Sequence, residues 1–328
     1  HNTATISADN EYPTDDNGNG WTISSSSLGT VENGCLKAIA LANPTLTAKT
    51  WTGYTIAIGD VFFADGSLAK KCSTYSSKKA VGMVISLSTS STDKNTHKFT
   101  HGYVISATCS LTTSGNWSVS GYNSEIVTGD NGFSHYTGSS TAQKDANIYT
   151  FITTDMDGYT KCNIVKRRAD YSASRYLAIG MADSYNTSVP VTTPNGICSG
   201  WYLPSSGQLY QYAYNFSGFS ANYLTSANVA YTGNATSYRA IVWGDQSTAE
   251  TAVMNWNKAF TDRGFSESGS NNKYTAAALY MPGSYWSCTE ASATNVYNLC
   301  PWSSGLHIDG NDSKIGDQEF RTRPVLAF

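Results

Sequence analysis

Residues 283–328 read GSYWSCTEASATNVYNLCPWSSGLHIDGNDSKIGDQEFRTRPVLAF, and we expect this C-terminal stretch to decide the fold. It starts with an aromatic turn, Tyr285-Trp286-Ser287, and ends in an apolar strand in which Arg321 and Arg323 occupy alternate positions. The residues between these ends mix small, polar and aromatic types without a persistent helical or strand period. A stiff frame around an irregular insert rich in side chains is typical of binding surfaces. We therefore interpret this stretch as the working face of the protein.

The composition favours a globular protein with a polar, nearly neutral surface. The chain has 328 residues, of which 40% are apolar and 14% charged, and its net charge is −3. This apolar content suffices for a core, while the small negative charge gives no basic field for nucleic acid or an anionic membrane. A surface of Ser, Thr, Asn, Gly and 22 tyrosines fits an extracellular, β-rich protein. No run approaches the about 20 apolar residues of a membrane span, so we expect no direct membrane insertion by this chain.

Seven cysteines are scattered along the chain, at positions 35, 72, 109, 162, 198, 288 and 300. They form no C-x-x-C pair, so the sequence offers neither a zinc site nor a thioredoxin-type motif. We expect most of them to be buried thiols, which behave as small hydrophobic groups, and Cys288 with Cys300 to be the candidate disulfide. The chain opens at His1 without a signal peptide, which suggests a processed or trimmed form. Export is therefore inferred from composition alone.

The chain divides into an N-terminal segment, residues 1–48, and a main domain, residues 49–328. The first is expected to be loop-rich with a short helix over Val31–Ala42, which Asn43-Pro44 ends because the residue before proline avoids helical dihedral angles. The main domain opens with a hairpin turn at Asp65-Gly66 and polar loops over 88–98 and 128–145. The predicted strands are Tyr54–Ile58, Val61–Phe63, Ala80–Leu87 and Gly102–Ala107.

Two helices follow, each with a capping signature and an apolar stripe. Ser205-Ser-Gly-Gln208 has the spacing of a capping box, and Ser247-Thr-Ala-Glu250 repeats it. Gly264 supplies a left-handed stop for the second helix. The stripes, which we interpret as core, are Leu209, Tyr212, Ala213 and Phe216, and then Ala249, Val253, Trp256 and Phe260. Strands, two helices, an irregular insert and a closing strand predict an α+β domain with segregated elements.

Three islands, in order, resemble a known family: GWYLPS at 200–205, YWSCTE at 285–290 and RTRPVLAF at 321–328. Together they are similar to C-type-lectin-fold domains of the branch that includes formylglycine-generating enzymes, in particular surface proteins of gut bacteria and their phages. The likeness spans roughly residues 50–328. It implies a C-type-lectin-like fold, with two helices packed on antiparallel strands and a long irregular insert that presents the ligand.

Within that branch, the YWSCTE and RPVLAF ends resemble the frame of variable proteins diversified by retroelements. In such proteins the frame stays constant and the residues between its ends vary; here Cys288 stands where the pattern has serine. The resemblance implies a frame of Trp201, Pro204, Tyr285, Trp286, Arg321, Arg323 and Pro324, with one arginine bracing loop carbonyls or carboxylates. It implies a ligand-binding set that points outward from the 288–319 insert: Ala291, Ser292, Thr294, Asn295, Tyr297, Leu299, Trp302, Ser304, His307, Asp309, Asn311, Asp312, Asp317 and Gln318. Tyr and Trp supply contact area, while Ser, Asn and Asp adapt their hydrogen bonds.

No catalytic or metal-binding motif competes with this interpretation. Asp309-Gly-Asn311-Asp312-Ser313 is the nearest approach to a calcium loop, but it lacks the glycine and the final acid of the helix–loop–helix type. The five histidines show no metal spacing, and there is no G-x-S-x-G elbow. We predict no cofactor, no metal and no catalytic residue.

We therefore predict an extracellular or surface-displayed receptor or adhesin that binds through the 288–319 insert. Its expected partner is a protein or glycan on another cell or phage host, and no nucleic acid. It would be located at the cell surface, with a lipid anchor outside this sequence, or on a phage particle. The alternatives are a fimbrial tip adhesin or structural subunit of fixed specificity, and an oxidase similar to formylglycine-generating enzyme.

Overall fold

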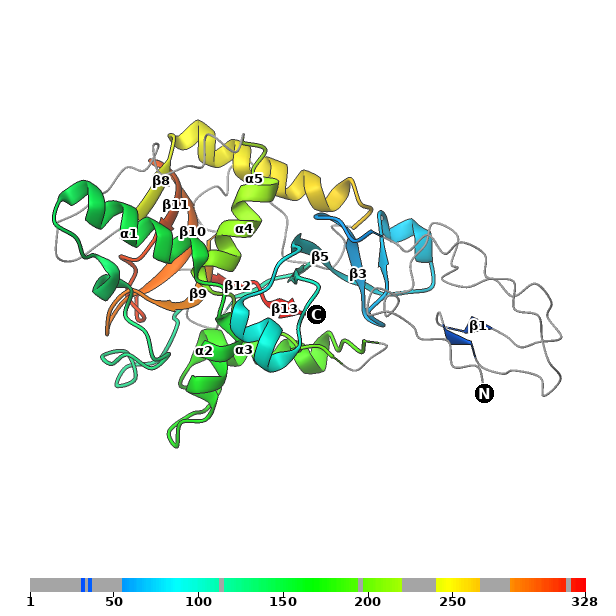
Figure 1. The fold of residues 1–328 in the computed structure, drawn as a ribbon, viewed down its shortest axis with the longest axis horizontal. Helices are drawn as coiled ribbons and strands as arrows, with labels where there is room; N and C mark the ends of the chain where they lie inside the picture. Colours follow the sequence, from blue (N-terminus) through cyan, green and yellow to red (C-terminus); the bar gives the residue numbers. More distant parts are fainter. Residues whose placement is uncertain are drawn as a thin grey trace.

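The computed structural model describes residues 31–32, 35–36, 55–111, 115–193, 197–219, 240–265, 284–316 and 320–328. These residues form an α+β structure with two larger sheets and several helices (Figure 1). The predicted fold class is confirmed at this level. In Figure 1 the two sheets lie next to each other along the long axis, with the helices around them. None of the described helices is long and apolar enough to cross a membrane.

The first sheet is antiparallel and contains most of the strands that the sequence predicts. Its five strands, in the order β13-β6-β5-β3-β4, are β3 (Val61–Phe63), β4 (Leu68–Ala69), β5 (Ala80–Ser86), β6 (Tyr103–Ser106) and β13 (Val325–Ala327). Gly66 has a φ of 79°, which a glycine adopts without strain, and it closes the predicted turn between β3 and β4. The predicted strand at 54–58 is wrong, because residues 55–57 form no regular structure and Ile58 begins a turn.

The second sheet overturns the prediction that the insert is irregular. Its six strands, in the order β7-β12-β9-β10-β11-β8, are β7 (Ser110–Leu111), β8 (Ala240–Trp243), β9 (Tyr285–Glu290), β10 (Val296–Trp302), β11 (Gly305–Asp309) and β12 (Arg321–Thr322). Much of the 288–319 insert therefore forms the centre of a sheet. Strands covered on both faces lose the alternation that marks a strand in sequence, and here buried Thr289, Asn298 and His307 break it further.

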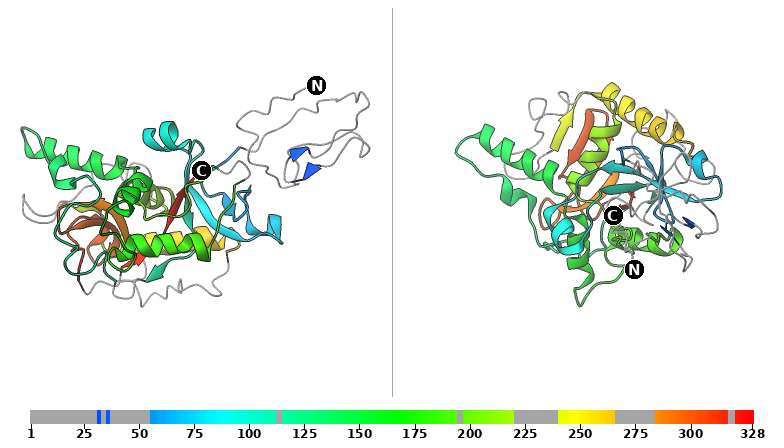
Figure 2. Two further views of the ribbon diagram at one scale, coloured as in Figure 1. Left: turned by 90° about the horizontal axis from the view of Figure 1, so that it is seen from below. Right: turned by 45° about the vertical axis from the view of Figure 1, so that its right-hand side comes forward.

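The C-terminal strand is divided between the two sheets. β12 pairs with β7 and β9 of the second sheet, whereas β13 pairs with β6 of the first. Buried Arg323 and Pro324 lie between them. The left view of Figure 2 shows the red C-terminal strands next to both the orange and the blue strands.

In the part of the chain that the structure describes, five α-helices surround the sheets, and the sequence predicts two of them. They are α1 (Thr141–Thr154), α2 (Gly158–Lys166), α3 (Leu177–Ser188), α4 (Ser206–Phe216) and α5 (Gln246–Thr261). α4 packs against β5 of the first sheet and against β9 and β10 of the second. The predicted stripes of α4 and α5 are buried, and Gly264 has the left-handed φ of 88° expected after α5. α1 begins inside the predicted loop over 128–145, so that expectation is wrong from Thr141 onward.

Shorter elements complete the description. Three single-turn helices, at Cys72–Tyr75 (η3), Asp93–His97 (η4) and Gly132–His135 (η5), lie in connecting segments, and η4 occupies part of the predicted loop over 88–98. In the N-terminal segment, β1 (Val31–Glu32) pairs with β2 (Cys35–Leu36), so the predicted helix over Val31–Ala42 is wrong at these four positions. The predicted boundary at residue 48 lies outside the described residues.

Candidate functional site: a loop surface on a buried polar base

The loops at one end of β10 and β11 come together as one polar surface. Asn295 of the β9–β10 loop forms a bridge with Ser313 of the segment after β11. Val296 N donates to Asp312 O at 3.1 Å, and Lys314 N donates to Thr294 O at 2.9 Å. We call this the loop surface, and of the predicted binding residues it contains Ser292, Thr294, Asn295, Asp309, Asn311 and Asp312. Thr294 and Asn311 are exposed, and the others are partly exposed.

Hydrogen bonds within the loop surface hold its side chains in place. The side-chain amide of Asn295 donates to the carbonyl of Asn311, which joins the two loops. Asn311 N donates to Asp309 Oδ1 at 2.8 Å, and Asn295 N donates to Ser292 Oγ at 3.1 Å. The surface is therefore ordered before any ligand arrives.

Two carboxylates give the loop surface an acidic part. Burial raises the pKa of Asp312 to about 6, and repulsion from Asp309 acts in the same direction. Asn298 Nδ2 donates to Asp312 Oδ2 at 2.7 Å, which opposes the shift. At neutral pH most Asp312 side chains are still ionised, so this part is negatively charged.

Four of the predicted binding residues do not point outward. Ala291, Tyr297, Leu299 and His307 are buried, which corrects the expectation that they contact a ligand. The Tyr297 ring lies against Gly132 and Gly310, where an added Cβ would come within 2.6 Å of it. Ala291 O accepts from Phe133 N at 2.9 Å. Both faces of β10 are covered, since α4 and α5 pack on the strand and η5 lies against Tyr297.

Trp302 and Ser304 lie away from the loop surface, at the turn between β10 and β11. This turn is at the opposite end of β10, about 20 Å away at about 3.3 Å per residue. Trp302 is 40% exposed, and Ser304 is exposed with its Oγ 3.0 Å from His307 Nε2. The predicted single face is thus divided into two. Asp317 and Gln318 lie outside the described residues.

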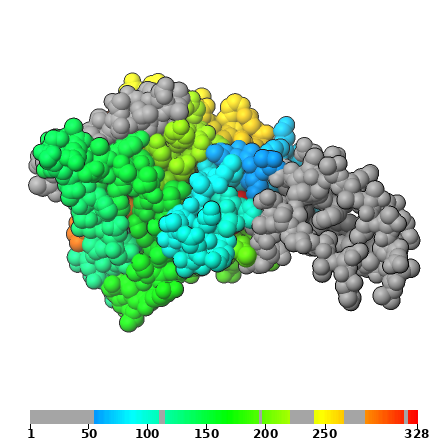
Figure 3. Space-filling model, in the orientation of Figure 1, coloured from blue at the N-terminus to red at the C-terminus, as the bar shows by residue number. Residues whose placement is uncertain are grey.

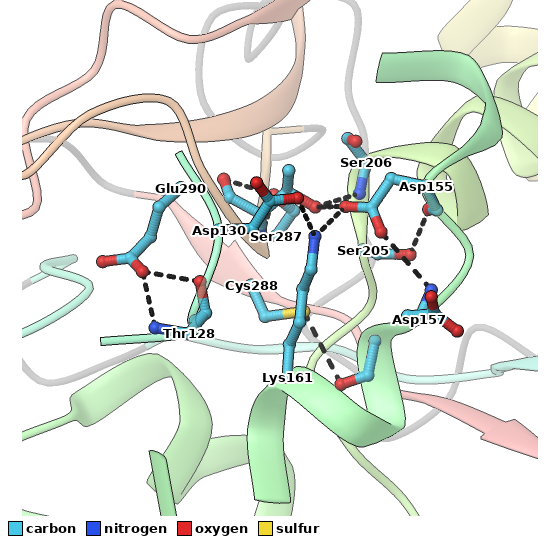
Figure 4. Close-up of polar contacts among 12 residues, drawn as sticks. Thr128, Asp130, Asp155, Asp157, Lys161, Ser205, Ser206, Ser287, Cys288 and Glu290 are labelled. Carbon is cyan, nitrogen blue, oxygen red and sulfur yellow. Dashed lines mark hydrogen bonds and ion pairs between the residues drawn. The ribbon is translucent and has the colours of Figure 1, made fainter. Parts of the chain in front are cut away.

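A fully buried ion pair anchors the loop surface from below. Lys314, which follows Ser313, pairs with Glu290 at the end of β9, and neither side chain has any exposed area. Glu290 Oε2 also accepts from Val127 N at 2.9 Å. It accepts from Thr128 N at 2.6 Å as well, as Figure 4 shows. Lys314 Nζ donates to Glu125 O at 2.6 Å, and burial lowers the pKa of this lysine. The pair fixes both loops to the segment before η5.

A second polar cluster joins three helices to β9. Lys161 Nζ on α2 lies 2.5 Å from Asp155 Oδ2, just after α1. Thr289 Oγ1 donates to the same oxygen at 2.5 Å and accepts from Ser206 N, at the start of α4, at 2.8 Å. Figure 4 shows these side chains converging, with Cys288 beside Lys161. Burial acts to lower the pKa of Lys161, but Asp155 and its other neighbours outweigh burial and the pKa is raised. No sequence motif predicts this cluster, because Thr289 lies far along the chain from Asp155 and Ser206.

The predicted frame residues lie mostly inside the protein. Trp201, Pro204, Tyr285, Trp286, Arg323 and Pro324 are buried, and Arg321 is partly exposed. Arg323 Nε donates to Ser106 O at 3.0 Å, and Nη2 donates to Ala107 O at 3.3 Å. Arg323 therefore braces the carbonyl of Ser106, at the end of β6, and that of Ala107, which follows β6. The sequence predicted that an arginine would brace carbonyls or carboxylates of the insert.

The contacts of Cys288 and Cys300 differ from the prediction. Cys288 lies against Cys162 of α2, whereas Cys300 Sγ accepts from Ser284 Oγ at 3.1 Å. The candidate Cys288–Cys300 disulfide is absent, and both residues are free thiols. Among the residues that the structure describes, no group of three or more His, Cys, Asp or Glu side chains could hold a metal ion.

Comparisons with known proteins add one similarity. No protein-family model matches the chain, and no curated protein matches it. A solved structure of a fimbrial protein from Bacteroides ovatus is similar, with a TM-score of 0.46 and 16% sequence identity. The match covers 83% of this chain and 49% of that protein, so the chain spans about half the length of the fimbrial protein.

Proposed function

We propose that this chain is an extracellular or surface-displayed ligand-binding protein that binds through the loop surface. One observation carries the proposal: exposed polar side chains lie on two loops that the buried Lys314–Glu290 pair fixes to a sheet. Hydroxyl, amide and carboxylate groups adapt their hydrogen bonds to many ligands. Loops already ordered before binding lose little conformational entropy when the ligand arrives, which favours affinity.

The proposed partner is a protein or glycan on another cell or phage host. In Figure 3 an orange part of the C-terminal region reaches the left edge of the visible surface, beside the green helices. Within this region, Thr294 and Asn311 are exposed and can contact a large partner. The proposed fold is C-type-lectin-like, and the proposed mode of action is shape and polar complementarity without a chemical step.

Substitutions on the loop surface test this proposal. Thr294→Arg and Asn311→Arg add bulk and charge at two exposed positions without touching the core. Ser304→Arg is the matched control, because Ser304 is equally exposed but lies at the far turn. Wild type and variants are screened on arrays of glycans and secreted host proteins, and thermal unfolding confirms that each variant is folded. We expect ligands of the wild type to bind at least about tenfold more weakly to the first two variants, which corresponds to about 1.4 kcal/mol.

The opposite pattern would overturn the assignment of the surface. Ligands that remain bound to Thr294→Arg and Asn311→Arg but are lost in Ser304→Arg would place binding at the Trp302 turn. A screen in which no variant changes the binding of any ligand would place it outside the C-terminal region.

Diversification by a retroelement is the finer proposal, and the structure makes it more specific. Variation that preserves the fold has to fall on exposed positions, since changes in a packed core are costly. Sequencing many copies of the gene's 3′ end, with its neighbourhood, should show adenine-directed differences at codons 292, 294, 295, 309 and 311 and constant codons for Tyr297 and Leu299. An invariant 3′ end without a nearby template would contradict diversification.

If the 3′ end is invariant, a fimbrial adhesin or structural subunit of fixed specificity is the second candidate. This chain shows weak similarity to a fimbrial protein. Electron microscopy of cells that express the gene, with antibody against this chain, separates the two candidates. Label along or at the tip of filaments supports the fimbrial one. Label over the cell body or on phage particles supports the first.

A further inference from the structure

Two buried thiols from different elements lie close together, beside the polar cluster of Lys161, Asp155 and Thr289 (Figure 4). Cys162 lies on α2 and Cys288 on β9, and both have almost no exposed area. Cys288 Sγ lies 3.7 Å from the carbonyl oxygen of Gly158. Gly158 is four residues before Cys162 on the same helix, and residues four apart share one face. The face of α2 that carries Cys162 is therefore the face that packs on Cys288.

The electrostatics of Cys288 agree with this placement. Its pKa is raised well above the usual value, first by burial and then by its closeness to Cys162. The contacts of the chain agree, because Cys162 Sγ donates to Leu203 O at 3.4 Å and Cys288 N donates to Pro204 O at 2.7 Å, so both cysteines lie against the same short segment. Cys300 and Cys198 lie elsewhere: Cys300 Sγ accepts from Ser284 Oγ, and Cys198 Sγ accepts from Gly200 N at 3.5 Å.

We propose that Cys162 and Cys288 form a disulfide when the chain folds in the presence of a low-molecular-weight disulfide. One cysteine thiolate attacks the small disulfide, forms a mixed disulfide and releases one small thiol. The second thiolate then attacks the protein sulfur of that mixed disulfide and expels the other small thiol. The protein pair loses two electrons, the small disulfide gains them, and the protons of the two cysteines pass to the released thiolates.

The bond forms during folding, because in the folded protein both thiols are buried and Cys288 is a poor nucleophile. Thiolate is the reactive species, and burial raises the pKa of Cys288. Both sulfur atoms are also inaccessible to an external disulfide in the folded protein. The reduced native protein therefore stays reduced, whereas the refolding chain, with both thiols open to solvent, becomes cross-linked.

The cross-link would fix the base of the loop surface. It joins α2, which carries Lys161, to β9, which carries Thr289 and Glu290. A disulfide that closes a long loop stabilises chiefly by limiting the unfolded chain. The inference concerns the chain's own chemistry and does not depend on which ligand the loop surface binds.

Peptide mapping after oxidative refolding tests the inference. The protein is unfolded and reduced, then refolded in mixed reduced and oxidised glutathione. The folded protein is then denatured, free thiols are blocked by alkylation, and the digested protein is analysed by mass spectrometry with and without reduction. We expect at least half of the folded molecules to contain a Cys162–Cys288 cross-linked peptide, and their thermal midpoint to lie about 5 °C or more above that of protein refolded in a reductant.

Cysteine variants provide the controls, and the peptide map of the wild type can be interpreted without them. Cys300→Ala should keep the cross-link, whereas Cys162→Ala should lose it and leave Cys288 alkylated. If an alanine variant fails to fold, the wild-type map still decides the question. Folded, glutathione-treated wild type in which most Cys162 and Cys288 are alkylated, or in which Cys288 is linked to Cys300, would overturn the inference.

Discussion

At the scale of single residues, the Lys314–Glu290 pair shows how the binding loops depend on the core. Both side chains are fully buried, and together they satisfy backbone groups of the segment at 125–128. Removing one partner of a buried pair leaves an uncompensated charge in the protein interior, which is more costly than the loss of the pair itself. The pair therefore matters for the order of the loop surface as well as for stability.

Lys314→Met should lower the free energy of unfolding by about 3–5 kcal/mol, because Glu290 then stays buried without its cation. Urea unfolding measures this change. The matched control is Lys258→Met, which removes the Lys258–Asp262 pair, where the side chains are 66% and 54% exposed. We expect that control to change stability by less than about 1 kcal/mol. Equal effects of the two substitutions would contradict the role assigned to the buried pair.

Asp93 should make the protein less stable as the pH rises from about 4 to about 6. Burial raises the pKa of this carboxyl to about 6, and repulsion from Asp157 adds to the shift, while the Tyr103 hydroxyl, which donates to it at 2.6 Å, opposes it. A carboxyl with a higher pKa in the folded than in the unfolded state, where it is about 3.9, holds its proton more tightly when folded. Its contribution is therefore fully present below about pH 4 and is lost by about pH 6, up to about 3 kcal/mol.

Asp93→Asn should flatten that dependence, because the amide keeps an acceptor for Tyr103 and carries no titrating proton. Urea unfolding of both proteins at several pH values between 4 and 7.5 measures the slope. A smaller slope should remain, since the pKa of Asp312 is also raised to about 6. Asp65, Asp170 and Asp245 have lowered pKa values and act below about pH 4, outside this window. Identical slopes in the two proteins would show that Asp93 does not titrate as described.

At the scale of elements, the start of α5 differs from its sequence signature. The spacing Ser247-Thr-Ala-Glu250 predicts a capping box, but Asp245 is the residue that caps the helix. Asp245 Oδ1 accepts from Thr248 N at 3.0 Å and from Thr248 Oγ1 at 3.1 Å. The predicted start at Ser247 is therefore displaced, and Ser247 lies inside the first turn.

Asp245→Ala should lower the thermal midpoint by about 2–4 °C, because an orphan amide of the first turn loses its acceptor. Ser247→Ala should leave the midpoint unchanged, since alanine is a good helix former and the cap remains. Differential scanning calorimetry of both variants distinguishes the two caps. A larger loss in Ser247→Ala than in Asp245→Ala would restore the capping box of the sequence prediction.

α1, one of the helices that the sequence missed, has a weak local signal. α1 reads TAQKDANIYTFITT, in which Thr, Asn and β-branched residues are weak helix formers. Its buried residues are few, Ile148, Ile152 and Thr153 among them, so the apolar period is faint. Packing of α1 against α4 supplies what the local sequence lacks. α4 and α5, with strong caps and clear stripes, are the helices that a single sequence reveals.

At the scale of the whole molecule, Arg323 connects the two sheets. It lies between β12 of one sheet and β13 of the other, and its guanidinium donates to Ser106 O and to the hydroxyl of Tyr285 at 3.0 Å each. Ser106 belongs to β6 of the first sheet and Tyr285 to β9 of the second. The guanidinium carbon Cζ of Arg323 also lies over the ring of Phe260, 4.6 Å from the ring centre.

Arg323→Lys should lower the free energy of unfolding by about 2–4 kcal/mol, because one ammonium group cannot reach the acceptors that a planar fork reaches at once. Arg167→Lys, at the exposed residue directly after α2, is the matched control and should change stability by less than about 0.5 kcal/mol. Urea unfolding followed by tryptophan fluorescence and by circular dichroism reports both sheets. A loss for Arg323→Lys no larger than that of the control would contradict the connecting role.

The sequence by itself determined the α+β class, the strands at 61–63, 80–86 and 103–106, and the helices of residues 206–216 and 246–261, because those signals are local. It also located the C-terminal region in which the loop surface lies. Only the tertiary structure decided that the insert is the centre of a sheet, that Tyr297 and Leu299 are buried while Thr294 and Asn311 are exposed, and that Cys288 faces Cys162. Burial on both faces of a strand erases its period, and contacts between residues far apart in the chain leave no spacing to recognise.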